Sequence, residues 1–154
     1  MPLERIDHYL LQTTDLAATR DWYVQTLGMR EGPHPDFRFP VVWLYLGDKD
    51  ILHVSEGGAN VSENRKRYLG QESTAESGSG VIDHIAFAGT GLKDMIERLQ
   101  KLGVPFTQRM VDDQGLYQLF LKDPVNGVKV ELSYANAEAR AAGIEPELKA
   151  AALS

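Results

Sequence analysis

The chain has 154 residues and a formal net charge of -6. This acidic balance argues against nucleic acid or an anionic membrane surface as a main partner. The absence of cysteine excludes disulfides, thiolate metal ligands and a thiol nucleophile. The sequence has no apolar run of roughly 18 residues, which a membrane span needs, and no apolar run behind a basic start. We therefore expect a cytoplasmic protein without a signal peptide or membrane segment.

Short blocks of the first half return in the same order in the second half. Residues 6–8, Ile-Asp-His, return as residues 82–84. The block at 51–55 is matched in the same way by the block at 129–133. Ordered blocks at a nearly constant spacing indicate that one structural unit is used twice.

The first copy, residues 3–55, opens with an apolar segment at 5–12 that predicts a β-strand. An amphipathic helix follows, with Thr14 or Asp15 as its N-cap and Gly28 as its end. Three shorter strands complete the copy, and we expect them at 29–32, 41–47 and 50–55.

A polar segment, residues 56–80, connects the copies as a surface linker, with a helical turn at 63–69. The second copy, residues 81–134, opens with a predicted strand at 81–88 and a helix that ends at Gly103. Three strands again complete it, and we expect them at 105–110, 116–122 and 128–134.

The last two predicted strands are joined by Asp-Pro-Val-Asn-Gly at 123–127, which favours a hairpin. The tail, residues 135–154, is rich in Ala and Glu, and we expect it to be helical from Asn136 to Leu153. Each copy therefore has the order β-α-β-β-β. The predicted fold class is α+β, with residues 1–154 forming one domain from two βαβββ modules around a curved mixed sheet.

Four side chains with metal-binding chemistry occupy matching positions of the two copies. His8 and His84 share one position of the repeat, and His53 and Glu131 share another. Because side chains alternate along a strand, all four point into one concave surface if the two copies form one curved sheet. Three imidazoles and a carboxylate suit one divalent ion such as Fe, Mn, Co, Ni or Zn. Such an ion can polarise a substrate that offers two vicinal oxygens.

Aromatic and amide side chains flank these positions on the neighbouring strands. Trp43 and Tyr45 share one face in the first copy, as do Gln118 and Phe120 in the second. They favour a small, oxygenated and flat substrate with aromatic character. Tyr117 is near them in the chain, although its parity is opposite to that of Phe120. We expect the substrate-binding residues to be Phe39, Trp43, Tyr45, Tyr117, Gln118 and Phe120.

The chain resembles the vicinal oxygen chelate superfamily from about Leu3 to Tyr134. This superfamily includes glyoxalase I, methylmalonyl-CoA epimerase, fosfomycin-resistance enzymes, extradiol dioxygenases and metal-free bleomycin-resistance proteins. The resemblance is carried by the repeated Asp-His and by the aromatic pair Trp-Tyr at 22–23 before Leu-Gly at 27–28. It is also carried by residues 115–132, GLYQLFLKDPVNGVKVEL, which resemble the final hairpin of that superfamily.

The resemblance implies a glyoxalase-like fold, a homodimer and a metal-dependent enzyme. It implies that His8, His84 and Glu131 are metal ligands. His53 stands at the position of a fourth ligand, which is usually Glu or Gln in glyoxalase- and epimerase-like members. His53 is therefore either a ligand or a base that moves a proton, and Glu131 is a second candidate for the base.

Three functions remain open from the sequence. A glyoxalase- or epimerase-like isomerase or lyase leads, because His53 occupies the fourth-ligand position. The first alternative is an Fe(II)-dependent extradiol-type dioxygenase that cleaves a catecholic ring. The resemblance to such enzymes implies a tyrosine near the site on the penultimate strand, where this chain has Phe120. The second alternative is a non-catalytic ligand-binding protein of the bleomycin-resistance type, which normally lacks the metal ligands.

Overall fold

The computed structural model of the chain describes residues 2, 4–70, 73–80, 82–146 and 148–149. The chain divides into two compact units, Met1–Gly78 and Ser79–Ser154, which we call unit 1 and unit 2. Within the described ranges, no helix has the length and apolar character needed to cross a membrane.

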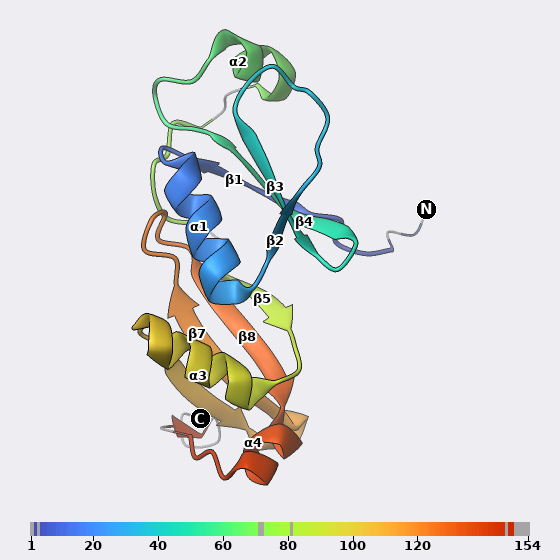
Figure 1. Cartoon of the computed structure of the whole chain (residues 1–154), viewed down its shortest axis with the longest axis vertical. Coiled ribbons are helices and arrows are strands. Elements are labelled where there is room, and N and C mark those ends of the chain that lie inside the picture. The colour runs from blue at the N-terminus through green and yellow to red at the C-terminus, as the bar shows by residue number, and fades with distance from the viewer. Residues whose placement is uncertain (1, 3, 71–72, 81, 147, 150–154) are drawn as a thin grey trace. The chain divides into compact units, whose positions relative to one another are not determined.

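Unit 1 contains one mixed sheet in the order β1-β4-β3-β2. Strand β1 runs parallel to β4, and the β2–β3 and β3–β4 pairs are antiparallel. Its elements are β1 (Tyr9–Thr13), α1 (Leu16–Leu27), β2 (Arg30–Gly32), β3 (Val41–Leu46), β4 (Lys49–Glu56) and α2 (Glu63–Leu69) (Figure 1).

Unit 2 repeats this plan and adds elements at its end. Its sheet has the order β5-β8-β7-β6-β9, with β5 parallel to β8 and β6 antiparallel to β7. Its elements are β5 (His84–Ala88), α3 (Leu92–Leu102), β6 (Thr107–Val111), a 3₁₀-helix (Asp112–Gln114), β7 (Leu116–Lys122), β8 (Lys129–Ala135), α4 (Asn136–Ala142) and β9 (Leu148–Lys149) (Figure 1).

The predicted α+β class and the two βαβββ modules are confirmed, with one sheet in each module. The first strand of each module begins later than we expected. In unit 1, pairing of β1 with β4 starts at Leu52, because β4 is irregular just before that residue. In unit 2, β8 begins at Lys129, the partner of His84, so no earlier β8 residue can pair with residues before His84.

The core of unit 1 lies between its sheet and α1. Val42 and Leu44 of β3 and Leu52 and Val54 of β4 are buried there with Tyr23 of α1. The helix begins after Asp15, whose carboxylate accepts a hydrogen bond from the Ala18 N–H at 3.0 Å. It ends at Gly28, whose φ of 75° suits glycine. Alternation along β3 and β4 then leaves the residues between these core positions on the other face.

The core of unit 2 is likewise built from its sheet and its first helix, α3. Leu119 of β7 and Val130 of β8 are fully buried, as are Leu92 and Leu99 of α3. The predicted hairpin between β7 and β8 is present, and the Asp123 carboxylate accepts hydrogen bonds from the next backbone N–H groups.

The prediction of one helix from Asn136 to Leu153 is wrong. Helix α4 ends at Ala142, and Gly143 adopts a φ of 67°. The chain then forms β9, which pairs with β6 in parallel. Alanine and glutamate favour helix, but edge pairing and a C-terminal glycine favour the observed course. Residues 147 and 150–153 lie outside the described residues.

Candidate metal and substrate site

The first predicted pair of ligands lies in unit 1, where the imidazoles of His8 and His53 stack. Their ring centroids are 3.8 Å apart and their planes differ by 17°. His53 is on β4 and its Cα partner on β1 is Leu10, two residues after His8. Strand pairing and alternation place the side chain of His53 on the face of the sheet opposite α1, and the stacking of the two rings places the His8 imidazole on that face as well.

Trp43 covers the other side of the His53 ring. It is the cross-strand partner of His53 on β3, and the two rings stack with centroids 3.8 Å apart and planes 6° apart. Two rings at this distance from His53 must lie on its opposite faces. The result is a three-ring stack of Trp43, His53 and His8, in which His53 is only 8% exposed.

The orientation of His8 is fixed by the residue before it. Nδ1 of His8 lies 2.7 Å from the Asp7 carboxylate, and Nζ of Lys49 lies 3.0 Å from that carboxylate. The hydrogen bonds from His8 and Lys49 lower the pKa of Asp7 to about 2. The charged carboxylate accepts a hydrogen bond from the Nδ1–H group, so Nε2 of the neutral ring keeps its lone pair for another partner.

The second predicted pair lies in unit 2. Nε2 of His84 is 3.5 Å from Oε1 of Glu131. The Cα partner of Glu131 on β5 is Ala86, two residues after His84, so the two side chains share one face. Glu131 is 9% exposed, and its other oxygen accepts a hydrogen bond from the Ser133 hydroxyl at 2.9 Å.

Unit 2 also repeats the contacts that fix His8 in unit 1. Nδ1 of His84 lies 2.8 Å from the Asp83 carboxylate, and Nζ of Lys129 lies 2.8 Å from the same oxygen. The hydrogen bonds from Lys129 and His84 lower the pKa of Asp83. We call the two sets, Asp7-His8-Lys49 and Asp83-His84-Lys129, the Asp–His–Lys arrangements. In both, the aspartate takes Nδ1 and leaves Nε2 available, as in many metal-binding histidines.

His53 is held differently, because its Nε2 lies 2.6 Å from the Asp50 carboxylate. Residues three apart on a regular strand point to opposite faces. Here the register moves from Leu44–Leu52 to Tyr45–Asp50, so Ile51 is an extra residue in β4. This bulge brings Asp50 to the face of His53.

The environment of His53 sets its charge. Burial lowers the pKa of His53, against the opposing hydrogen bond to Asp50, and that hydrogen bond lowers the pKa of Asp50. A neutral imidazole that donates from Nε2 to Asp50 keeps its lone pair on Nδ1. Nδ1 is therefore the atom with which His53 can bind a metal or accept a proton.

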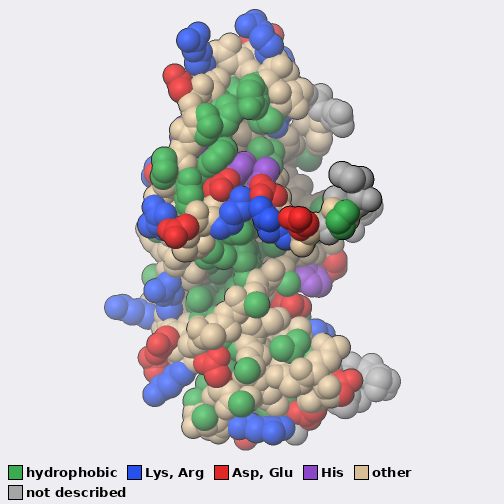
Figure 2. Space-filling view, turned by 90° about the vertical axis from the view of Figure 1, so that its right-hand side faces the viewer, with side chains coloured by type: hydrophobic (Ala, Val, Ile, Leu, Met, Phe, Trp, Pro, Cys, Tyr) green, Lys and Arg blue, Asp and Glu red, His purple; other side chains and the backbone are tan. Residues whose placement is uncertain are grey.

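A cavity of about 280 Å³ lies beside the three-ring stack. His8 and His53 form part of its wall, and the other lining residues are aromatic or aliphatic. On the face shown in Figure 2, histidine side chains lie between hydrophobic side chains and a group of acidic and basic ones. The apolar wall includes Pro35 and Phe37 from the β2–β3 loop, Phe39, Trp43, and Tyr68 and Leu69 from α2.

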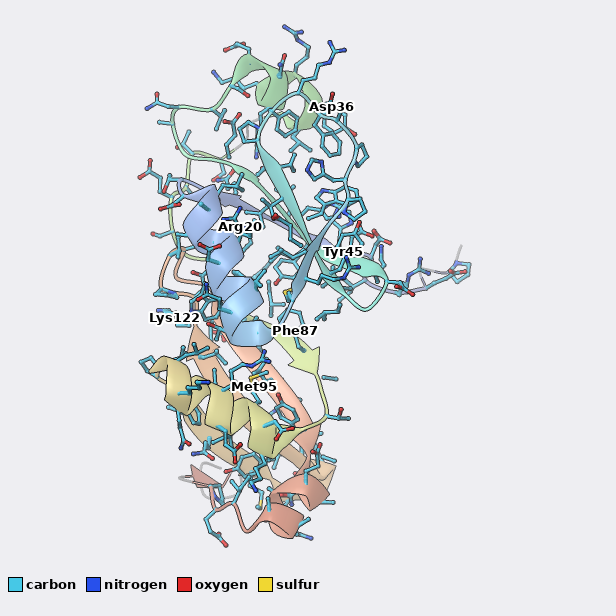
Figure 3. The ribbon with its side chains drawn as sticks, viewed as in Figure 1. Arg20, Asp36, Tyr45, Phe87, Met95 and Lys122 are labelled. Atoms are coloured by element: carbon cyan, nitrogen blue, oxygen red, sulfur yellow. The ribbon has the colours of Figure 1, made fainter. Side chains whose placement is uncertain are left out.

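Two predicted substrate-binding residues, Phe39 and Trp43, line this cavity. Tyr45, labelled in Figure 3, does not line it. Its hydroxyl donates to the Pro33 carbonyl, and its ring lies under the Arg30 guanidinium, 4.9 Å away. Sequence reasoning missed Tyr68 and Leu69, which we assigned to a linker.

The other predicted substrate-binding residues are in unit 2. Phe120 lies edge-on to the His84 ring, with centroids 6.2 Å apart. Gln118 is buried, and its carbonyl accepts hydrogen bonds from the Arg109 guanidinium at 2.6 and 3.0 Å. Tyr117 is fully buried on the opposite face of β7, where its hydroxyl donates to Gln108 at 2.7 Å. Its place in the core does not support the predicted contact with substrate.

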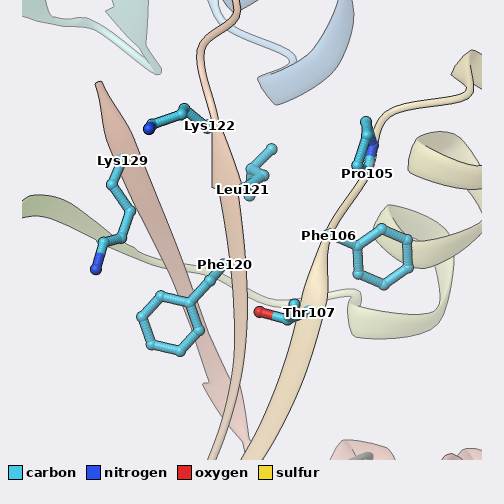
Figure 4. Close-up of a pocket in the computed structure, with 7 residues that line it drawn as sticks. All are labelled: Pro105, Phe106, Thr107, Phe120, Leu121, Lys122 and Lys129. Carbon is cyan, nitrogen blue, oxygen red and sulfur yellow. The ribbon is translucent and has the colours of Figure 1, made fainter. Parts of the chain in front are cut away.

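A second cavity, of about 370 Å³, lies at one end of the sheet of unit 2. Apolar side chains of Phe106 and Phe120 and the amines of Lys122 and Lys129 border it (Figure 4). Lys122 and Lys129 are direct cross-strand partners, and the ammonium group of Lys129 lies 2.8 Å from the Asp83 carboxylate.

The structure thus joins the predicted metal ligands as two pairs, His8 with His53 and His84 with Glu131. Among the residues that the structure describes, no three histidine, acidic or cysteine side chains gather closely enough to hold an ion. Each unit supplies half of the predicted set.

The sequence profile of the Glyoxalase/Bleomycin resistance protein/Dioxygenase superfamily matches residues 5–132. Among solved structures, the chain is similar to a lactoylglutathione lyase from Agrobacterium tumefaciens. The two chains are 18% identical, with a TM-score of 0.63, over 87% of this chain and 96% of that one.

Two further solved structures share the fold. One is a glyoxalase/bleomycin resistance protein/dioxygenase from Nocardioides, with 18% identity, a TM-score of 0.63, and coverage of 88% of this chain and 85% of that one. The other is the trypanothione-dependent glyoxalase I of Leishmania major, with 21% identity, a TM-score of 0.56, and coverage of 92% and 94%.

Proposed function

Because the chain belongs to the Glyoxalase/Bleomycin resistance protein/Dioxygenase superfamily, we propose that it is a metal-dependent enzyme that binds a small substrate through two vicinal oxygens. One observation carries the proposal: each unit by itself brings together the two ligands predicted in it. The stacked rings of His8 and His53 do so in unit 1, and the 3.5 Å contact of His84 with Glu131 does so in unit 2.

The donor atoms fit a divalent ion. Nε2 of His84 keeps a lone pair because Asp83 takes Nδ1, and this lone pair faces a carboxylate oxygen. Two electron-rich atoms at this distance favour a cation or a proton between them. Nε2 of His8 is left available in the same way, and nitrogen and oxygen donors suit Fe, Mn, Co, Ni or Zn.

The leading reaction is a glyoxalase- or epimerase-like isomerisation or lyase reaction, in which a proton leaves a carbon next to a carbonyl. When bound, the ion supplies Lewis-acid polarisation of the two substrate oxygens. His53 accepts the proton at Nδ1, because Asp50 holds its Nε2 at 2.6 Å. Asp50 then stabilises the charged imidazole, as a carboxylate does for a histidine base in other enzymes.

Glu131 is a ligand in this proposal and not the base. Its Oε1 faces His84 and its Oε2 is held by Ser133. Both oxygens therefore have partners within unit 2. Structures of proteins named lactoylglutathione lyase and glyoxalase I share the fold, which supports this class of reaction without identifying the substrate.

The second candidate is an Fe(II)-dependent extradiol-type dioxygenase. One observation favours it: His53 is committed to Asp50 through Nε2. If His53 is not a ligand, the remaining set is His8, His84 and Glu131, and two histidines with one carboxylate are typical of non-haem Fe(II) oxygenases. The aromatic cavity of unit 1 also suits a catecholic ring.

Metal analysis tests the ligand set. We expect the purified protein to bind one divalent ion per chain, and we expect His84→Ala to lose this ion. His34→Ala is the matched control, because the ring of His34 contacts the Pro35 carbonyl in an exposed loop. Retention of the ion by His84→Ala, or its equal loss in His34→Ala, contradicts the proposal.

Two assays separate the reactions. Isomerase or lyase activity predicts exchange of the proton next to the carbonyl of a 2-keto or thiohemiacetal substrate, with loss of exchange in His53→Ala. Dioxygenase activity predicts oxygen uptake with catechols in the presence of Fe(II). Binding of an aromatic ligand without metal and without turnover favours the bleomycin-resistance type instead.

We also propose that the protein is a homodimer, as the predicted class implies. Mixing His8→Ala and His84→Ala variants tests where the halves of a site come from. Recovery of part of the metal binding means that the two pairs of one site belong to different copies. No recovery means that both pairs belong to the same chain.

A further inference from the structure

We propose that the cavity beside His8 and His53 binds an uncharged aromatic ring. The cavity lies within unit 1 and has a volume of about 280 Å³. Cavities of about 150 Å³ with apolar walls can bind benzene. The space in unit 1 therefore accommodates one aromatic ring with a short substituent.

The wall is built from rings of three separate segments. Phe37 contacts Phe39 with centroids 5.6 Å apart, and contacts Tyr68 of α2 edge-on at 5.0 Å. Phe37 also contacts Trp43 of β3 at 6.1 Å. These separations are in the range in which aromatic pairs attract each other, so an inserted ring finds both faces and edges to pack against.

The wall offers no formal charge to pair with a charged ligand. None of the residues that line the cavity is Lys, Arg, Asp or Glu. The polar groups of its lining side chains are the imidazoles of His8 and His53, the phenol of Tyr68 and the indole N–H of Trp43. A carboxylate or an ammonium group that enters such a space loses its hydration without a partner. The cavity therefore selects an uncharged ring, in contrast to the cavity of unit 2, which has two lysines at its border.

The rim of the cavity presents apolar surface to solvent. Tyr68 is 65% exposed, and Leu10 and Leu69 are also among the exposed large hydrophobic residues. Exposed apolar side chains that gather at one place commonly mark a binding site. A ring in the cavity would cover these side chains and gain their burial.

The position of the cavity defines the substrate class. His8 and His53 form one part of its wall, so a ring packed against Phe37 and Tyr68 directs its substituent toward the imidazoles. The assignment of this ring to the substrate rests on the proposed function. We infer that the substrate joins an uncharged aromatic group to two vicinal oxygens, and is not a multiply charged peptide-thiol adduct.

The test uses Trp43 as a local reporter. The chain has two tryptophans, so Trp22→Phe leaves Trp43 as the single indole signal in an NMR spectrum of ¹⁵N-labelled protein. Metal-free protein is titrated with benzyl alcohol, cyclohexylmethanol and benzoate. These probes compare an uncharged ring, a saturated ring of similar size and a charged ring.

We expect benzyl alcohol to shift the Trp43 indole signal saturably. Benzoate should bind at least about tenfold more weakly, because its charge is not paired. Cyclohexylmethanol should also bind more weakly than benzyl alcohol, because a saturated ring lacks the aromatic contacts. In the same background, Tyr68→Ala and Phe37→Leu should weaken binding of benzyl alcohol by about 2- to 10-fold through the loss of ring contacts. Phe106→Leu, in the cavity of unit 2, is the control and should leave binding unchanged.

Three results overturn the inference. They are the absence of a saturable shift with benzyl alcohol, binding of benzoate as tight as or tighter than that of benzyl alcohol, and binding of benzyl alcohol to Tyr68→Ala and Phe37→Leu that is as tight as in the parent Trp22→Phe protein. Tyr68 is 65% exposed, so Tyr68→Ala leaves the core of unit 1 intact, and the amide spectrum checks the fold of the variant. Repeating the titration with Zn²⁺ separates the two proposals. Ring binding without metal binding defeats the proposed function alone, and metal binding without ring binding defeats this inference alone.

Discussion

The two units share a fold and an Asp–His–Lys arrangement, but they differ in the partner of the histidine. In unit 1 the partner is His53, a buried imidazole held by Asp50. In unit 2 it is Glu131, a carboxylate held by Ser133. The repeated fold thus presents a histidine ligand in each unit, His8 and His84. The neighbouring position holds a proposed base in unit 1, His53, and a proposed metal ligand in unit 2, Glu131.

A single extra residue produces much of this difference. Strand β8 keeps a regular register with β7 from Lys129 to Glu131. Strand β4 has Ile51 as an extra residue opposite β3, and this bulge turns Asp50 to the face of His53. The comparison teaches that a bulge can give one repeat an Asp–His pair that the other repeat does not form at its equivalent position.

The walls of the two units differ as well. In unit 1 a cluster of aromatic rings closes a cavity without formal charges in its lining. In unit 2 the cavity has Lys122 and Lys129 at its border. We therefore expect unit 1 to hold the uncharged part of a ligand, and unit 2 to contribute the charged metal ligand.

The largest effects should come from removing the side chains of His53 and Glu131, to which we assign different tasks. Glu131→Ala should abolish metal binding, because it removes the only carboxylate of the set. His53→Ala should keep the ion and lower turnover by about 10²- to 10⁴-fold, the usual contribution of a general base. Metal analysis and turnover of the same preparations check this.

His34→Ala is again the control for loss of an imidazole. Equal loss of the ion in His53→Ala and Glu131→Ala would show that His53 is a ligand and that the two units share one task.

A smaller effect should follow from removing the aspartates that fix His8 and His84. Asp7→Asn and Asp83→Asn should each weaken metal affinity by about 10- to 100-fold, the range for groups that orient metal-binding histidines. Calorimetric titration with Zn²⁺ measures this. Asp113→Asn, in an exposed 3₁₀-helix, should have no effect. A large loss for one aspartate and none for the other would break the equivalence of the two units.

The smallest effect concerns stability at alkaline pH and belongs to unit 2. Burial raises the pKa of Tyr134 on β8 to about 12. A group whose pKa is raised on folding favours the folded state below its unfolded pKa of about 10, and this stability is lost as pH rises toward 12. Wild type should therefore lose about 1 kcal/mol more than Tyr134→Phe between neutral pH and about pH 11.

Urea unfolding followed by two probes locates this loss. Trp22 and Trp43 are both in unit 1, so tryptophan fluorescence reports that unit, while circular dichroism reports both. We expect the alkaline loss in the circular dichroism transition. The same loss in Tyr134→Phe would refute the assignment to Tyr134.

Much of the fold was predictable because the repeat and the two-residue period of the strands are local signals. Alternation places the core residues Leu52 and Val54 on one side of β4 and His53 on the other. The same rule placed Glu131 on the face of His84. The face that each of these side chains occupies depends on its neighbours in the same strand, so it can be predicted from the sequence.

The other features of the site depend on strand register and on tertiary contacts, which cannot be predicted from the sequence. The extra residue Ile51 has no distinctive type, so the approach of Asp50 to His53 could not be predicted. Asp7 and Asp83 precede β1 and β5, and are therefore not held to the opposite face by strand alternation. The contribution of Tyr68 to the cavity arises from the tertiary position of α2.

The central claim is that His8, His84 and Glu131 bind one ion, while Asp50 holds His53 apart from it as the base. NMR spectroscopy of histidine ring nitrogens during a Zn²⁺ titration tests it most directly. We predict saturation at one ion per chain, with Nε2 of His8 and His84 bound to zinc, and with the Nε2 proton of His53 and the signals of His34 unchanged. Saturation at two ions per chain, or a zinc-bound His53 with His8 or His84 unaffected, would contradict the account.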